Sequence, residues 1–319
     1  MLVISWAAQH GRSASLAAEL GGRDVYLMKG ILNRRTAVFR YLRATYLSHR
    51  EIRKTRPGAV ILMLPPFPAL VVLLCLARIY GFELYLDCHS GVFNDPKWEW
   101  ARRPTLALAK LSCGVIVTNR ELEAEIRERG FQVLVIDDPP LRSLPARPRD
   151  SEFGTVLFPC SYSSDEPVDQ VQDAARKSPS LRFILTGDAP PGVVKQAPRN
   201  VFFTGWLTAE QYSESLINAQ VVLALTIRPL TMQRAGYEAM AYGKALVTAE
   251  STVLQSYFQD AAVYVNPMSG ESIREGILKA VRNAQHYERE ILRLYEKKCE
   301  IFERQIDPLR RRLAQSTSV

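Results

Sequence analysis

Arg234 and Glu238 stand one helical turn apart in a stretch whose residue types suit the binding of a charged ligand. The pattern predicts a helix over residues 232–242, capped at its N-terminus by Thr231 and ended by Gly243 in a left-handed conformation. The first amides of such a helix, its dipole and a guanidinium all favour an anion at one spot. The alternative is an ordinary ion pair between Arg234 and Glu238 on a solvated helix face.

A diphosphate is the anion that this arrangement fits, and a carboxylate one turn further can accept hydrogen bonds from sugar hydroxyls. We expect Gln233, Arg234 and Ala235 to bind the diphosphate, Gly236 to lie in the same ligand site, and Glu238 to bond ribose or sugar hydroxyls.

Asp87 and His89 could perform proton transfer, because they follow a predicted buried strand over residues 83–87. A neutral imidazole can take a proton from a hydroxyl, and a neighbouring carboxylate can orient it. We therefore expect His89 or Asp87 to be a general base. Contact with a donor sugar, a structural role and a buried core histidine remain the alternatives for His89.

Further polar residues follow other predicted strands. Ser161 and Ser163 come after the strand at 155–158 and can bond phosphate or ribose, or else the serines and acids of this loop cap the next helix. Gly187 would let a ligand approach the backbone. Arg228 could face a diphosphate or be a surface charge.

The sequence Glu238-Ala-Met-Ala-Tyr-Gly-Lys-Ala-Leu-Val resembles the EAMAxGxPVV block of nucleotide-sugar glycosyltransferases. These are family 4-like enzymes with two Rossmann-like domains, the GT-B architecture. The similarity extends through residues 200–206, 219–224 and 262–265.

This resemblance implies roles for two further loops. It places Gly205, Trp206 and Leu207 beside the nucleotide base, and the loop of His10, Gly11 and Arg12 on the acceptor side. It also implies that the last helix crosses back onto the first domain.

The chain departs from this family at Leu230. Related retaining enzymes carry a glutamate there, eight positions before the one matched by Glu238. Its loss leads us to favour an inverting reaction. No metal or cofactor is required, since arginines and the helix dipole would stabilise the leaving diphosphate.

Strands and helices must position these residues, and apolar runs alternate with helical stretches through both halves of the chain. Such alternation predicts an α/β protein with two doubly wound Rossmann-like domains facing a central cleft. We expect an acceptor domain at 1–138, a Pro-rich linker at 139–152, a donor domain at 153–284 and a helical tail at 285–319. GxGxxG is absent after the first strand, which argues against an NAD oxidoreductase.

Residues 34–56 carry eight Lys or Arg and one acid, interleaved with apolar residues. Such a helix can lie on an anionic membrane, or it packs on the sheet with a solvated basic face. We expect no nucleic-acid partner, because no recognised module accompanies the charge.

The net charge of +8 favours anionic partners, and five scattered cysteines without metal spacing indicate a reduced, cytoplasmic protein. The start of the chain lacks the features of a signal peptide. Residues 59–80 are apolar, but three prolines indicate a strand followed by a helix rather than a membrane span. Peripheral binding at the inner face of the cell membrane would fit the basic helix.

Together these features predict a metal-independent glycosyltransferase that moves a sugar from a nucleotide diphosphate sugar to a hydroxyl acceptor. By resemblance, the acceptor is a bacterial surface glycan or its polyprenyl-linked precursor. A nucleotide-sugar epimerase or hydrolase of the same fold is one rival. A catalytically idle nucleotide-binding or membrane scaffold is the other.

Overall fold

A computed structural model describes residues 1–7, 11–28, 37–88, 91–127, 130–141, 152–229 and 231–316. Contacts divide the chain into two units, which we call the first and second unit. The first contains Met1–Pro139 and Ile301–Val319, and the second contains Pro140–Glu300. Residues 142–151 of the predicted linker lie outside the described residues.

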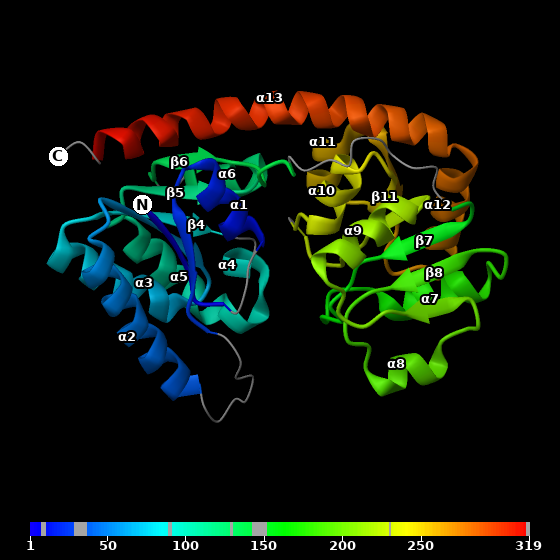
Figure 1. Cartoon of the computed structure of the whole chain (residues 1–319), viewed down its shortest axis with the longest axis horizontal. Helices are drawn as coiled ribbons and strands as arrows, with labels where there is room; N and C mark the ends of the chain where they lie inside the picture. Colours follow the sequence, from blue (N-terminus) through cyan, green and yellow to red (C-terminus); the bar gives the residue numbers. More distant parts are fainter. Residues whose placement is uncertain are drawn as a thin grey trace. The chain divides into compact units, whose positions relative to one another are not determined.

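The first unit is built on a parallel sheet ordered β2-β1-β3-β4-β5-β6 (Figure 1). Its strands are β1 (Leu2–Ser5), β2 (Arg23–Tyr26), β3 (Ala59–Leu64), β4 (Glu83–Cys88), β5 (Gly114–Val117) and β6 (Val133–Val135). Every residue of β3 is buried, as expected for a strand covered on both faces. The chain order reverses between β1 and β3, where ligands of such sheets usually bind.

The first unit's helices are α1 (Gly11–Glu19), α2 (Ala37–Thr55), α3 (Phe67–Tyr80), α4 (Gly91–Asn94), α5 (Glu99–Ala109) and α6 (Arg120–Arg127), with a 3-10 turn, η2 (Pro96–Trp98). Two prolines precede α3, and Gly81 ends it in the left-handed region, donating its amide to Ala77. Residues 59–80 are therefore a strand and a helix, as predicted. In the part of the chain that the structure describes, no helix is long and apolar enough to span a membrane.

The second unit's sheet is also parallel, in the order β12-β11-β10-β7-β8-β9. Its strands are β7 (Thr155–Phe158), β8 (Arg182–Leu185), β9 (Val201–Phe203), β10 (Val221–Ala224), β11 (Ala245–Ala249) and β12 (Ala262–Val265). The order reverses between β7 and β10, so the loops after these two strands begin side by side at the carboxyl edge.

Helices cover both faces of this second sheet. They are α7 (Val168–Arg176), α8 (Pro191–Gln196), α9 (Ala209–Asn218), α10 (Arg234–Ala241), α11 (Thr252–Phe258) and α12 (Gly270–Arg282), with a 3-10 turn, η3 (Gln259–Ala261). Apolar residues of α7 and α12 form the core on one face, and those of α9, α10 and α11 form the core on the other. The predicted fold of two doubly wound units is confirmed.

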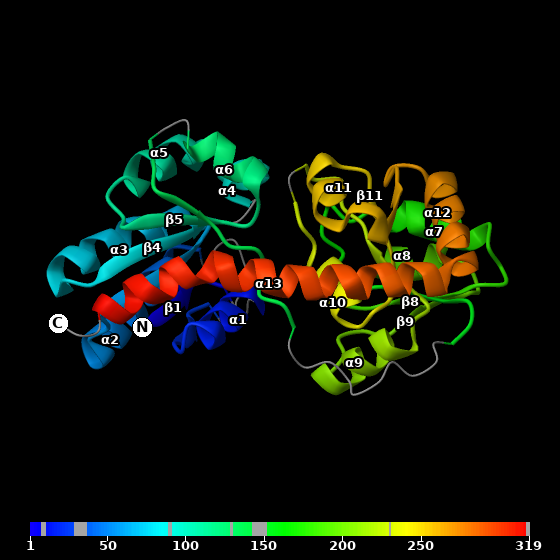
Figure 2. The same ribbon diagram turned by 90° about the horizontal axis from the view of Figure 1, so that it is seen from above.

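The last helix, α13 (Ala284–Ser316), contributes to both units. Ile291 and Leu294 belong to a core cluster of the second unit. Phe302 and Ile306 are buried with Leu16 of α1 in the first unit's core, and Figure 2 shows this end of α13 running beside α1. The helix therefore completes the first sheet's cover, as the resemblance implies.

Candidate active site

At the switch point of the second sheet, hydrogen bonds join the loop after β7 to the loop after β10. Asp165 accepts from the hydroxyl of Thr226 at 2.9 Å, and its carbonyl accepts from the Ile227 amide at 2.9 Å. The guanidinium of Arg228 lies 3.4 Å from the same carboxylate. Asp165 thus holds Arg228 at the carboxyl edge, and this contact engages part of the charge that we expected to face a diphosphate.

The loop after β7 is organised around a second acid, Glu166. One carboxylate oxygen accepts from the amides of Ser161 and Ser163, each at 2.9 Å, and from the Ser161 hydroxyl at 3.3 Å. Burial raises the pKa of Glu166. The Ser163 hydroxyl donates to Asp165. Both predicted serine hydroxyls therefore have partners within the loop.

The alternative reading of this loop as a helix cap is wrong. The N-cap residue of α7 is Pro167, which has no side chain that can accept from the helix amides. The acids and serines bond one another instead.

A cavity of about 320 Å³ opens beside this loop, lined by the first turn of α7 and by side chains that include Ile227 and Met268. Its acidic side chains are the carboxylates of Glu166 and Asp169, with no lysine or arginine among its lining residues. A diphosphate would be repelled here, whereas hydroxyl groups would find acceptors.

Gly187 and Gly205 connect the ends of β8 and β9. The amide of Gly187 donates to the carbonyl of Gly205 at 2.9 Å, and both residues have positive φ, at 78° and 68°. A Cβ on Gly187 would stand 2.3 Å from the carbonyl oxygen of Cys160. The loops after β7 and β8 thus meet at backbone distance. Trp206 follows this pair with 70% of its surface exposed, and Leu207 is half-buried.

Helix α10 begins two residues later than predicted. Its N-cap residue is Gln233, which makes no side-chain cap, while the hydroxyl of Thr231 donates to the Pro229 carbonyl. The prediction that Thr231 caps this helix is therefore wrong. The predicted end is confirmed, since Gly243 has a φ of 61°. Leu230 lies outside the described residues.

Glu238 lies buried on α10 between two donors. The Nε of Arg234 donates to one oxygen at 2.9 Å, and the hydroxyl of Tyr212 on α9 donates to the other. Burial, followed by the charge of Glu238, raises the pKa of Tyr212 well above its ordinary value. The ion pair between Arg234 and Glu238, which was the alternative interpretation, is present. It is partly buried and Tyr212 joins it, so the Glu238 carboxylate is held in place.

The first turn of α10 leaves two of the predicted amides pointing out of the helix. The amides of Arg234 and Ala235 precede any intrahelical acceptor. Gly236 donates its amide to the Gln233 carbonyl at 3.0 Å, and a Cβ there would stand 2.7 Å from the Phe258 ring. We therefore attribute the glycine at 236 to close packing of α10 on α11.

In the first unit, the buried guanidinium of Arg12 bonds the end of β4 to the segment that follows β6. Arg12, in the first turn of α1, donates from Nε and Nη2 to the Asp87 carboxylate at 3.0 to 3.2 Å. Its Nη1 donates to Asp138 at 2.8 Å and to the Asp137 carbonyl, and its Nη2 also donates to the Ile136 carbonyl. Burial alone would lower the pKa of Arg12, but the two carboxylates outweigh it and raise that pKa.

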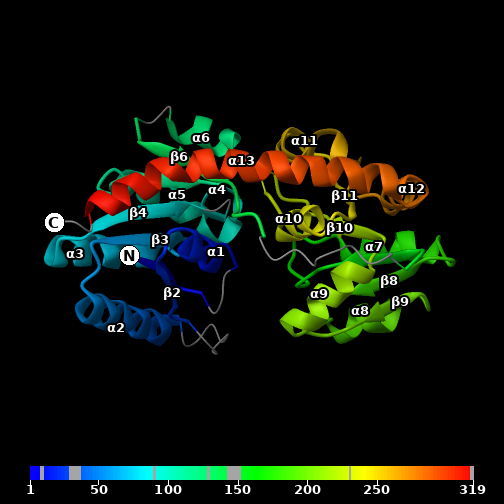
Figure 3. The ribbon, with the colours of Figure 1, turned by 45° about the horizontal axis from the view of Figure 1, so that its top comes forward.

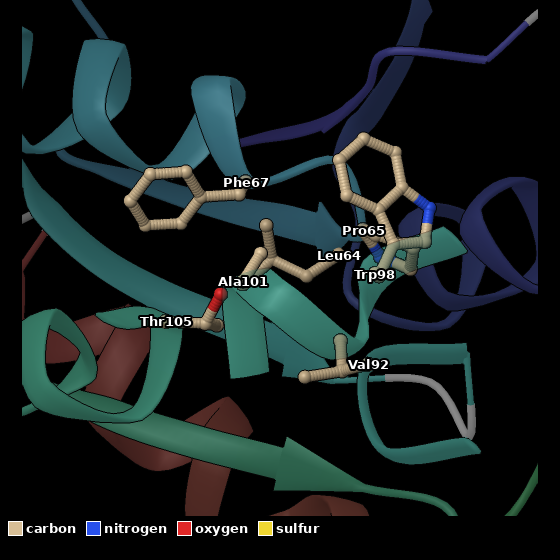
Figure 4. Close-up of a pocket in the computed structure, with 7 residues that line it drawn as sticks. All are labelled: Leu64, Pro65, Phe67, Val92, Trp98, Ala101 and Thr105. Carbon is tan, nitrogen blue, oxygen red and sulfur yellow. The ribbon is translucent and has the colours of Figure 1, made fainter. Parts of the chain in front are cut away.

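Asp87 is fully buried, and β4 ends at Cys88. His89 and His10 lie outside the described residues, and Gly11 begins α1. The structure therefore brings Arg12 and Asp87 together, although they were predicted for different roles. At the end of β3, an apolar recess of about 10 Å³ lies between Phe67, Val92 and Trp98 (Figure 4). This volume holds no more than a water molecule.

Comparison with known proteins relates the second unit to a protein family. Residues 165–297 match a family model described as "Glycosyl transferases group 1". This segment is a group 1 glycosyltransferase domain. It starts at Asp165 in the loop after β7 and includes all of α10. No curated protein matches the sequence significantly.

Solved glycosyltransferase structures resemble the whole chain, beyond the glycosyltransferase domain itself. Sucrose-phosphate synthase from Thermosynechococcus elongatus is 14% identical, with a TM-score of 0.75, covering 98% of this chain and 97% of the other. Anabaena HepE, in complex with UDP and glucose, is 15% identical, with a TM-score of 0.70 and 99% of each chain covered. At these identities the likeness establishes the fold, which is GT-B.

Five side chains of the glycosyltransferase domain and the first unit take part in these networks although they were not among the predicted site residues. They are Asp138, Asp165, Glu166, Tyr212 and Thr226. Asp165 and Glu166 offered a signal, since adjacent acids follow a strand in a hydroxyl-rich loop. Tyr212 offered none, because its partner is 26 residues away.

Proposed function

We propose that this chain transfers a sugar from a nucleotide diphosphate sugar to a hydroxyl acceptor. The observation that carries the proposal is the fixed carboxylate of Glu238 one turn from the outward amides of Arg234 and Ala235, within a group 1 glycosyltransferase domain. HepE, a structural neighbour, has been solved with UDP and with UDP-glucose, which agrees with a nucleotide-sugar donor.

In this proposal the diphosphate lies at the start of α10. The helix dipole, the two amides and Arg234, whose side chain is 43% exposed, stabilise the negative charge that develops on the leaving diphosphate. Arg228 lies in the loop between β10 and α10 and adds positive charge. These groups supply the charge stabilisation that a metal ion would provide, so we expect turnover in the presence of a chelator.

Glu238 accepts hydrogen bonds from ribose or sugar hydroxyls. We place the nucleotide base near Gly205, Trp206 and Leu207, where an exposed indole offers a face for stacking. Hydroxyl groups of the donor would occupy the acid-lined cavity beside Glu166. This arrangement separates the anionic part of the donor from its neutral part.

We assign the general base to His89 and a positioning role to Asp87. Both oxygens of Asp87 accept from Arg12 in a fully buried site, so this carboxylate cannot take a proton from an acceptor without breaking its ion pair. Arg12 in turn fixes the end of β4, from which His89 follows. Direct attack by an acceptor activated in this way inverts the anomeric centre.

The acceptor in this proposal is a polyprenyl-linked precursor of a surface glycan. The test is to incubate the protein with a panel of nucleotide sugars, with and without polyprenyl-diphosphate-linked acceptors, and to measure nucleotide release and products in chelator. Acceptor-dependent release with inverted product, seen by NMR, supports the proposal. Release or epimerisation without acceptor indicates a hydrolase or epimerase, and binding without turnover indicates a scaffold.

Two variants connect this assay to the residues. Arg234→Gln should lower kcat by at least about tenfold, because it removes one charged donor that stabilises the transition state. His89→Gln should abolish transfer, whereas His286→Gln on α13 is the matched control and should leave it unchanged. Transfer at the native rate by the His89 variant would remove the proposed base.

A further inference from the structure

The outward face of α2 carries large apolar side chains that the fold leaves exposed. Val38, Phe39, Leu42 and Tyr46 expose 68, 74, 62 and 62% of their surface. Residues four apart lie on one row of a helix, so Val38, Leu42 and Tyr46 follow one another along this face. Single exposed apolar residues are common, but four together form a patch that marks an interaction site.

The opposite face of α2 is fixed in the first unit. Ala44, Ser48 and Ile52 are fully buried, and the indole of Trp6 donates to the Ser48 hydroxyl at 3.0 Å. His49 bonds the Tyr80 hydroxyl of α3 at 2.8 Å. Figure 3 shows α2 on the face of the first sheet opposite the end of α13. The patch is therefore held in a defined orientation.

The outward face of α2 also carries positively charged side chains that no acid neutralises within the described residues. Arg43, Arg50, Arg53 and Lys54 are exposed, and within the described residues none of them makes an ion pair or hydrogen bond. The single acid of α2, Glu51, pairs with Arg23 at 2.6 Å. On α13, by contrast, Arg293 and Arg311 are paired with acids one turn away.

The exposed apolar residues and most of the exposed cations occupy different parts of α2 along its axis. The exposed apolar residues occupy the first part, up to Tyr46, and three of the four cations occupy the part from Arg50 to Lys54. At 1.5 Å per residue, Val38 and Arg50 are about 18 Å apart along the axis. A helix lying flat would place apolar and charged groups at the same depth, so this one fits an interface that it enters end first.

We propose that α2 docks the protein on an anionic lipid bilayer in a tilted orientation. Its exposed apolar side chains enter the acyl boundary, and its C-terminal cations lie at the level of the lipid phosphates. Arg43, which lies among the apolar residues, reaches that level along its flexible stem. A bilayer supplies a dense anionic layer directly above an apolar one, which matches both halves of this face. A nucleic acid would satisfy the cations but would leave Val38 and Leu42 in water.

This inference concerns binding and is independent of the transfer reaction, so it can be tested without substrate. The full chain is floated with phosphatidylcholine vesicles and with vesicles that also contain phosphatidylglycerol. We expect binding only when the anionic lipid is present, and a strong loss of binding at high salt, because exposed charges are screened.

Two sets of variants separate the apolar and the charged halves. Arg50→Gln, Arg53→Gln and Lys54→Gln together should weaken partitioning about a hundredfold, from about fivefold per cation. The control removes three exposed cations of the second unit, Lys195→Gln, Arg199→Gln and Lys279→Gln, and leaves the same net charge. It should keep most of the binding.

Phe39→Ser with Leu42→Ser should weaken partitioning at least about tenfold, and the control pair Phe153→Ser with Ile79→Ser, also exposed, should not. All of these side chains are exposed, so circular dichroism should show folded variants. Equal binding to neutral vesicles, or equal losses in the control sets, would overturn the proposal. Self-association in light scattering that Phe39→Ser and Leu42→Ser abolish would show that the patch binds a second copy instead.

Discussion

Two glycines that hydrogen-bond each other should respond very differently to the same substitution. Gly187→Ala and Gly205→Ala each place a Cβ on a residue with positive φ, which costs about 1 to 2 kcal/mol. At Gly205 the nearest atom to that Cβ is 3.9 Å away, so this strain is the whole expected cost.

At Gly187 the Cβ would stand 2.3 Å from the carbonyl oxygen of Cys160. That oxygen belongs to the backbone directly after β7, so relief requires the end of the strand to move. Overpacking of this kind costs about 1 to 3 kcal/mol, which brings the expected total for Gly187→Ala to about 2 to 5 kcal/mol. We expect it to destabilise the protein by about 1 to 3 kcal/mol more than Gly205→Ala, because the strain at positive φ is common to both.

Urea titration followed by far-UV circular dichroism measures this difference. The comparison uses the transition that both variants shift, because two units can unfold in separate steps. The urea dependence of the unfolding free energy should stay the same, so that the midpoints compare directly. Equal destabilisation by the two alanines would refute the close approach of the loops after β7 and β8.

Three further predictions concern buried or half-buried acids and their partners. Arg12→Met should lower the free energy of unfolding by about 3 to 5 kcal/mol in a urea titration followed by tryptophan fluorescence, because it leaves Asp87 buried and uncompensated. Adding Asp87→Asn should recover part of the loss. Glu166 has a raised pKa, so its contribution to stability is complete below its ordinary pKa and is lost as pH rises through the raised value. Glu166→Gln should therefore gain in stability relative to the native protein as pH rises from about 4 to about 7, and a constant difference would contradict this. Tyr212→Phe removes one donor to Glu238 and should raise KM for the donor more than it changes kcat, while thermal unfolding shows whether the fold is kept.

Much of the fold follows from local patterns. Residues 59–64 are apolar and end at prolines, and β3 followed by α3 is the strand and helix predicted within residues 59–80. The short helices α4, α8 and α11 were not predicted, because one or two turns carry too little periodic pattern to distinguish a helix from a loop. The start of α10 was misplaced because Thr231 turns its hydroxyl back to the Pro229 carbonyl.

The candidate site is less visible in the sequence because its contacts are long-range. Arg12 bonds Asp87 from 75 positions away, and Asp165 bonds Thr226 from 61 positions away. Strand order decides such pairs, and no local spacing encodes it. Sequence reasoning therefore named Arg12, Asp87 and Glu238 as important, yet it could not say which donors hold each carboxylate.

The division of α13 between the two units also sets an order in which the chain can fold during synthesis. The core of the first unit includes Phe302, Ile306, Leu309 and Leu313. These residues leave the ribosome after the whole second unit, so the first sheet is made early yet keeps an apolar face uncovered until synthesis reaches α13. The later unit can therefore complete its core first, and chaperones have most reason to bind the earlier one.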